Sequence, residues 1–220
     1  DLWHTSGHYA NYKENMYFSK QDEVDVAVKP MNCPCHMLIF GTKQHSYREL
    51  PLRMADFGRL HRYERSGVTA GLTRVRSFCQ DDAHIFVRED QIGDEVANVI
   101  RMIREVYDVF GLSEPLVYLS TRPEKRLGSD DLWDRAEAAL EHAIKVNNLN
   151  FKINANDGAF YGPKIDFNVK DAIGRYFQLS TIQLDYQLPA RFRLEYVDAD
   201  NSRKQPVVIH RAVLGSLERF

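Results

Sequence analysis

The chain has 220 residues, with 29 lysines and arginines against 31 aspartates and glutamates, and a formal net charge of −2. This balance excludes a strongly basic surface for nucleic acid or membrane as a general property, although it allows a local basic pocket. Hydrophobic residues make up 44% of the chain, which is enough for a substantial core, so disorder is not expected.

The cysteine content and the hydropathy pattern indicate the compartment. Three cysteines are too few for a disulfide framework and favour a reducing environment. No apolar run approaches the roughly 18–20 residues that a membrane-spanning helix needs. Residues 1–16 also lack the basic and apolar regions of a signal peptide. We therefore expect a cytoplasmic protein without membrane association.

The first half of the chain predicts strands around one short helix. Residues 23–30 carry valine at alternate positions, which predicts a short half-buried strand. An asparagine followed two residues later by proline predicts a short helix that ends before Gly41. Residues 51–64 and 74–88 then form two long extended segments, joined by a glycine-containing loop.

The second half mixes helices with strands. Residues 94–110 and 130–148 repeat apolar side chains at helical spacing, and Gly111 ends the first of these two helices. The pattern is strand-rich from residue 151, and residues 210–220 are expected to form a final helix. Strand runs interspersed with helices predict an α+β fold in which helices flank an antiparallel β-sheet.

One face of the segment 74–87 carries chemically active side chains. Residues of an extended strand alternate between its two faces. One face is mostly small or apolar, an ordinary core face that includes Asp81 and Cys79, and we expect no chemical role for Cys79. The other face holds Arg74, Arg76, Phe78, Gln80, Asp82, His84 and Phe86. Periodicity alone also allows a solvated face of an edge hairpin, but phenylalanine interleaved with arginine, aspartate and histidine favours binding of an anion beside an aromatic ring.

The strand before this segment supports the same interpretation. Arg62 and Glu64 share one face next to the connecting loop, where the arginine can hold a phosphate and the carboxylate can accept from an amine. An isolated R-x-E pattern is weak. Followed by a loop and by Arg74, Phe78 and Asp81 at fixed spacing, it becomes a specific signal.

The stretch KPMNCPCHM places Cys33, Cys35 and His36 within four positions, which suggests a metal site. The cluster either binds a metal by itself or contributes one ligand to a site completed from elsewhere. Two cysteines separated only by proline cannot easily turn toward one tetrahedral ion. Each of these residues alone is more often a packed core residue.

Several motifs resemble those of class II aminoacyl-tRNA synthetases. HRYE, the glycine-bearing loop and RVRSFCQDD resemble motif 2, and VVIHRAVLGSLERF resembles motif 3. Within the class, KPMNCP, LPLRMADFGRLHR, QDDAHIF, GAFYGPKIDF and TIQLDYQLP are similar to the threonyl-tRNA synthetase family. The resemblance runs across nearly the whole chain. It implies a class II synthetase-like antiparallel β-sheet flanked by helices.

The resemblance implies one zinc ion per chain, bound by Cys33, His84 and His210, with one coordination position open to substrate. Cys35 stands where the family has glycine, and we expect it to be a small buried residue. A competing role for it as a ligand is the alternative. His36 is expected to pack or cap locally.

The resemblance also implies binding roles in a site for ATP with Mg²⁺ and for threonine. Arg62 would bind the α-phosphate, Glu64 the adenine side, and Arg74 the outer phosphates. Phe78 and Arg219 would enclose the base, and Arg62 and Arg219 would be the catalytic residues. The amino-acid and adenylate pocket would be lined by Gln80, Asp82, Tyr161, Lys164 and Gln183, with Gln183 also counted among the nucleotide-binding residues.

Residues 1–220 are therefore expected to form the catalytic core, without the motif 1 region, the editing domain and the anticodon-binding domain. The resemblance implies activation of threonine and its transfer to tRNA(Thr). It also implies a homodimer, although the motif 1 interface is missing from this chain. Two alternatives stay open: a non-catalytic binding module or truncated form, and a paralogue that activates serine or proline. The candidate zinc ligands argue against the paralogue. A zinc hydrolase would leave the phosphate-binding arginines unexplained.

Overall fold

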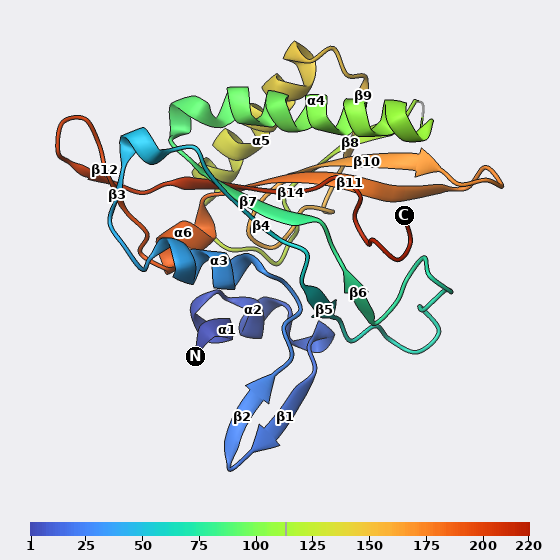
Figure 1. Ribbon diagram of the computed structural model, residues 1–220, viewed down its shortest axis with the longest axis horizontal. Helices are drawn as coiled ribbons and strands as arrows, with labels where there is room; N and C mark the ends of the chain where they lie inside the picture. Colours follow the sequence, from blue (N-terminus) through green and yellow to red (C-terminus); the bar gives the residue numbers. More distant parts are fainter. Residues whose placement is uncertain (113) are drawn as a thin grey trace.

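The computed structural model describes residues 1–112 and 114–220, and a seven-stranded β-sheet runs through its centre (Figure 1). All neighbouring strands pair antiparallel except β8 and β9, which pair parallel. This confirms the expected α+β fold with an antiparallel sheet. In spatial order the strands are β4 (Leu52–Asp56), β7 (Asp82–Val87), β14 (Val207–Ala212), β11 (Tyr176–Asp185), β10 (Lys164–Lys170), β8 (Leu116–Ser120) and β9 (Phe151–Asn154).

Two long helices, α4 (Ile92–Phe110) and α5 (Asp130–Val146), cover one face of this sheet, as Figure 1 shows. Their apolar stripes, with Ile100 and Leu140 fully buried, pack on the sheet and form the larger core. Gly111 ends α4 with φ 67°, a left-handed conformation in which glycine meets no Cβ penalty. Both helices predicted from apolar spacing are confirmed.

The opposite face carries short elements and a second core. Here α3 (Cys33–Phe40) and α6 (Gln187–Arg191) lie below the sheet, with α1 (Leu2–Thr5), α2 (His8–Asn11) and the 3₁₀ turn η1 (Lys13–Asn15) beyond them (Figure 1). Pro34 lies in the first turn of α3, where its missing N–H has no helical partner to lose, and the helix ends at Gly41 as predicted.

Smaller sheets and turns complete the chain. The two-stranded pairs are β1 (Phe18–Gln21) with β2 (Val24–Ala27), and β5 (Arg59–His61) with β6 (Ser77–Cys79). A three-stranded sheet joins β3 (His45–Ser46), β12 (Tyr196–Val197) and β13 (Arg203–Lys204), and η2 (Tyr47–Glu49) and η3 (Glu89–Gln91) are single 3₁₀ turns. The strand predicted at 23–30 exists, but its half-burial was wrong. Val24 is 61% exposed because the hairpin projects from the body without a covering layer (Figure 1).

Three other expectations were also wrong. Segment 51–64 is two strands, because β4 joins the central sheet whereas β5 pairs with β6. Segment 74–88 is two strands, because β6 pairs with β5 whereas β7 joins the central sheet, and Gln80 between them bridges to Ser216. Residues 210–220 do not form the expected helix within the described chain. Strand β14 continues through His210 to Ala212, paired on both sides, and is followed by turns. In the described residues, no helix is both long and apolar enough to span a membrane.

Candidate active site

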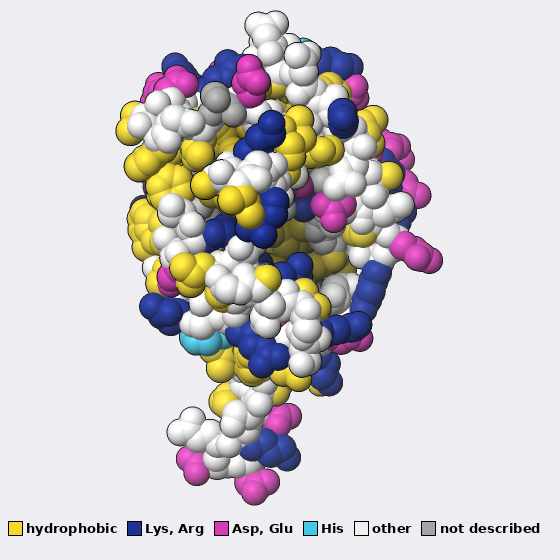
Figure 2. Space-filling view, turned by 90° about the vertical axis from the view of Figure 1, so that its right-hand side faces the viewer, with side chains coloured by type: hydrophobic (Ala, Val, Ile, Leu, Met, Phe, Trp, Pro, Cys, Tyr) yellow, Lys and Arg dark blue, Asp and Glu magenta, His cyan; other side chains and the backbone are white. Residues whose placement is uncertain are grey.

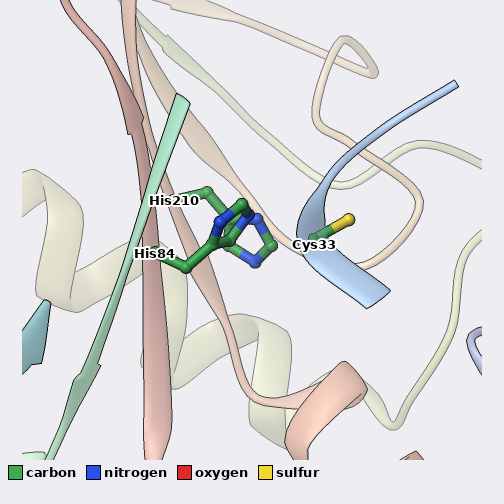
Figure 3. A group of neighbouring side chains, drawn as sticks. All are labelled: Cys33, His84 and His210. Carbon is green, nitrogen blue, oxygen red and sulfur yellow. The ribbon is translucent and has the colours of Figure 1, made fainter. Parts of the chain in front are cut away.

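Three distant segments bring Cys33, His84 and His210 together beneath the central sheet (Figure 3). Cys33 begins α3, while His84 and His210 are directly opposite each other on the paired strands β7 and β14. One ligand atom from each residue lies within 4.8 Å of the others, and all three side chains are buried. The structure therefore brings together the three residues that the resemblance selected.

The chemistry of these three side chains fits a zinc ion. Zinc binds thiolate sulfur at about 2.3 Å and imidazole nitrogen at about 2.0–2.1 Å, and one thiol with two imidazoles is a donor set typical of this ion. Burial lowers the pKa of His84 well below its ordinary value, and His210 and His36 lower it further, which keeps the imidazole neutral. Neutral imidazole is the form that binds metals. Burial also raises the pKa of the Cys33 thiol well above its usual range, so a bound cation is needed to hold the thiolate.

Cys35 does not take part in this group among the described side chains. Two helical positions separate it from Cys33, which turns it about 200° around the axis of α3. It is half-buried, so the expectation of a buried residue was wrong. The short cluster thus contributes one candidate ligand, and the candidate group is completed from β7 and β14.

The histidine of the same cluster has a partner that the sequence did not indicate. The Nδ1 atom of His36 lies 2.7 Å from Nδ1 of His84, so local packing or capping was the wrong expectation. The imidazole of His210 also has a partner, since its Nε2 lies 2.9 Å from Oδ2 of the fully buried Asp185. The three-residue spacing from Cys33 to His36, which places both on one side of a helix, was the available signal.

His8 is a second histidine that sequence reasoning missed. It is fully buried, with Nδ1 2.8 Å from the hydroxyl of Ser6 and Nε2 3.9 Å from the sulfur of Cys33. Burial, helped by the charges of His210 and Arg62, lowers its pKa to about 3. The imidazole is therefore neutral beside the candidate metal group. Its only sequence signal was its place in the segment GHYANY.

A small cavity of about 50 Å³ opens beside the metal group. Asp82 lies at its wall with Oδ1 3.9 Å from Nε2 of His84, while Asn32 donates to its other oxygen over 3.1 Å. Tyr161 stacks on the His210 ring, with 4.9 Å between the ring centroids, and donates to Gln183. Of the predicted residues this cavity is lined by Cys33, Arg62, Gln80, Asp82, His84, Tyr161, Gln183 and His210.

A larger cavity of about 350 Å³ adjoins the first and is also lined by predicted residues. Arg62, Gln80 and Thr181 border both cavities, so the two lie side by side, and together they are called the cleft below. Figure 2 shows a hollow on this side of the molecule with arginine and lysine side chains around it. The predicted residues along the larger cavity are Arg62, Glu64, Arg74, Phe78, Gln80 and Arg219.

Each arginine of the cleft is held by a partner within the protein. Arg62 donates to the carbonyl of Pro30 over 3.2 Å and holds its guanidinium 5.1 Å from the centroid of the Phe78 ring. Arg74 pairs with Glu64 at 2.9 Å. Arg219 donates to the carbonyl of Gln178 and lies over Phe177.

In the structure, the contacts of Phe78 and Arg219, and those of Lys164, differ from the contacts that their predicted roles would give. Phe78 and Arg219 border the same cavity, yet each already has its own stacking partner, Arg62 and Phe177 respectively. Lys164 is opposite Gln183 in the β10–β11 register, but its ammonium pairs with Asp166 at 2.9 Å and Asp157 at 3.1 Å and borders neither cavity.

Asp81, which we expected on an ordinary core face, organises the turn that borders the larger cavity. Its carboxylate accepts the backbone N–H groups of Val213, Leu214 and Gly215 at 2.8–3.0 Å and pairs with Arg211. Gly215 has φ 66°, and a Cβ there would meet the carbonyl oxygen of Leu179 at 2.7 Å. The carboxylate thus fixes the backbone before Ser216 and Arg219.

Asp81→Ala is expected to lower the free energy of unfolding by about 3–5 kcal/mol. The substitution leaves buried N–H groups without their acceptor and removes the carboxylate partner of Arg211, which keeps only its bond to the backbone carbonyl of residue 81. Urea unfolding measures the loss. Asp90→Ala is the matched control, because its exposed pair with Arg88 contributes about 1 kcal/mol or less. Equal stability of the two variants would contradict the role of Asp81.

The comparisons with known proteins agree with this geometry. A family model described as the tRNA synthetase class II core domain (G, H, P, S and T) matches residues 16–220. A threonine–tRNA ligase of Bdellovibrio bacteriovorus is 57% identical over all of this chain and 34% of that protein. The chain therefore spans about a third of the length of the curated relatives it matches.

Solved structures show the same likeness. The crystal structure of the RNA binding domain of threonyl-tRNA synthetase from Cryptosporidium parvum has a TM-score of 0.95 at 49% identity, over 100% of this chain and 55% of that chain. The putative threonyl-tRNA synthetase ThrRS-1 of Aeropyrum pernix has a TM-score of 0.82 at 37% identity, over 99% of this chain and 51% of that chain.

Proposed function

Because this chain belongs to the family of class II tRNA synthetase core domains, we propose that it is the catalytic core of a threonyl-tRNA synthetase. In this proposal it activates threonine with ATP and Mg²⁺ to threonyl-adenylate and transfers threonine to tRNA(Thr). One observation carries the proposal: a cleft with a Cys/His/His group at one end and arginines at the other, joined through Arg62, Gln80 and Thr181.

The metal end of the cleft suits an amino acid with a hydroxyl group. A bound zinc would supply a Lewis acid for the amino and hydroxyl groups of threonine. Asp82, oriented by Asn32, faces this cavity as an acceptor for the hydroxyl proton. A site with buried polar groups that must be satisfied by a substrate hydroxyl rejects an analogue without it by about 10⁴–10⁵-fold. Valine is such an analogue of threonine, so the cavity can exclude it.

The arginine end of the cleft suits the phosphates and base of ATP. Activation is attack of the threonine carboxylate on the α-phosphate, and the reaction needs correct placement and neutralisation of charge rather than an enzyme nucleophile. Arg62 borders both cavities and is therefore assigned to the α-phosphate. Arg74 is assigned to the outer phosphates, Glu64 to the adenine side, and Phe78 and Arg219 to the base. Lys164 and Gln183 are assigned to the adenylate from their adjacent positions on β10 and β11.

The test is amino-acid-dependent ATP–pyrophosphate exchange on the zinc-loaded protein with threonine, serine or valine. We expect exchange with threonine, none with valine, and weaker exchange with serine, because loss of one methyl group costs about 1–3 kcal/mol. A reaction without amino acid measures the background. Exchange that favours serine or proline would replace this proposal with the paralogue. No exchange with any amino acid would favour a non-catalytic binding module.

Transfer to tRNA(Thr) is a separate step of the proposal, and aminoacylation of tRNA(Thr) by the same preparation tests it. The three cysteines are free thiols, in keeping with a reducing compartment, and we place the activity in the cytoplasm. Charging of tRNA(Thr) without exchange would contradict the adenylate mechanism, because the adenylate precedes transfer.

A further inference from the structure

Each histidine of the candidate metal group has one ring nitrogen engaged outside the group. For His84 this is Nδ1, which lies 2.7 Å from Nδ1 of His36. For His210 it is Nε2, which lies 2.9 Å from Oδ2 of Asp185. The nitrogen left to face an ion is therefore Nε2 of His84 and Nδ1 of His210, so the two ligands use opposite ring positions.

The partner of His210 determines where that ring carries its proton. A carboxylate only accepts hydrogen bonds, so His210 must donate from Nε2 and keeps its lone pair on Nδ1. The orientation of the Asp185 carboxylate is fixed. Its Oδ1 accepts the backbone N–H groups of Gln187 at 2.7 Å and Leu188 at 3.0 Å, at the start of α6, so Oδ2 stays directed at His210. It is 0% exposed, so water does not compete for the carboxylate.

The partner of His84 is the neutral imidazole of His36, which can accept a hydrogen bond on one ring nitrogen and donate from the other. To present a lone pair on Nε2, His84 must donate from Nδ1, and His36 must then accept on Nδ1 and carry its own proton on Nε2. His36 follows Cys33 by three positions on α3, so one helix supplies a ligand and the acceptor that orients another ligand.

We infer that His36 and Asp185 are positioning residues that set the tautomers of the two ligating histidines, so that metal is bound through Nε2 of His84 and Nδ1 of His210. The inference rests on the proposed function for the identity of the metal group. It adds two residues to that site and assigns each a distinct hydrogen-bonding role. Partners of this kind orient the ring and raise its basicity toward the metal.

Substitutions of His36 and Asp185 that keep or remove the hydrogen-bond acceptor for the neighbouring histidine test the inference. Asparagine places its amide oxygen where histidine has Nδ1, whereas glutamine reaches the place of Nε2 and leucine offers no acceptor. His36→Asn should therefore keep zinc affinity within about threefold, and His36→Leu and His36→Gln should lower it by about 10–100-fold. Asp185→Asn should lower it similarly, because its oxygen stays on the backbone N–H groups and its amide donates to His210, moving the ring proton onto Nδ1.

Zinc affinity is measured by competition with a chromophoric chelator, and the Co²⁺-substituted protein is examined by visible absorption. We expect the His36→Asn spectrum to match the parent, and the Asp185→Asn and His36→Leu spectra to lose tetrahedral ligand-field intensity. Far-UV circular dichroism of the metal-free variants checks the fold. Parent-like affinity and spectra for both His36→Leu and Asp185→Asn would overturn the inference.

Metal binding and adenylation are measured separately, so the two proposals fail in different ways. If Cys33→Ala held zinc as tightly as the parent, the metal group and with it this inference would be overturned. If the variants followed the expected order of zinc affinity but no amino acid supported exchange, the inference would stand and the proposed activity would fall.

Discussion

Arg62→Gln is expected to reduce threonine-dependent ATP–pyrophosphate exchange by about 10²–10³-fold. A positioned group that neutralises charge developing in the transition state contributes about this much. Arg62 is the only arginine among the residues proposed for the substrates that borders both cavities in the described structure. Its bond to the Pro30 carbonyl and its contact with Phe78 hold the guanidinium before substrate arrives, so little ordering is needed during the reaction.

The control for this substitution is Arg65→Gln, three residues further along the chain. The Arg65 side chain is 78% exposed and, among the described residues, forms an ion pair only with the exposed Glu14, so its loss should leave exchange within about twofold. Arg62→Lys should recover only part of the rate, because an ammonium keeps the charge but not the planar, two-pronged geometry. An exchange rate for Arg62→Gln close to that of Arg65→Gln would remove Arg62 from the proposed catalytic residues.

Cys33→Ala is expected to abolish zinc retention, whereas Cys35→Gly should preserve it. Cys33 supplies the thiol of the buried group, and Cys35 lies on another side of α3 and outside that group within the described structure. Metal content after dialysis measures the difference. Threonine-dependent exchange should fall with the zinc in Cys33→Ala, since the hydroxyl of the substrate then has no metal to bind.

Glycine inside a helix costs about 1 kcal/mol relative to alanine, so Cys35→Ala accompanies Cys35→Gly as a second control. Loss of zinc in Cys35→Gly alone would then reflect a weakened helix. Loss of zinc in both Cys35 variants, with retention in Cys33→Ala, would show that the ligand assignment is reversed.

Local patterns predicted the elements whose form depends on neighbouring residues. Helices α4 and α5 follow from apolar side chains at helical spacing, and α3 follows from its proline and its terminal glycine. The antiparallel sheet followed from strand-rich segments. The half-burial expected for β2 did not hold, because alternation marks one face of a strand but cannot supply the layer that would cover it.

Pairing between distant strands decided the secondary structure of segments 74–88 and 210–220, which differs from the prediction. The chain between β6 and β7 is broken because Gln80 and Asp81 are bound to the turn after β14, far along the sequence. The same contacts explain why the final segment starts as a strand. His210 to Ala212 lie between β7 and β11, where hydrogen bonds on both sides favour extended backbone over a helix.

The sequence by itself, through its resemblance to a known family, indicated the candidate side chains: Cys33, His84 and His210 for a metal, and arginines with an aromatic ring for a nucleotide. Residue types narrow the choice, because only certain side chains can bind zinc or phosphate, and the resemblance selects the set among them. The tertiary structure alone decided that the two ends share one cleft and which nitrogen of each histidine is free. These properties depend on His36, Asp81 and Asp185, whose partners come from distant strands and turns, and a hydrogen bond between distant segments leaves no periodic pattern in the chain.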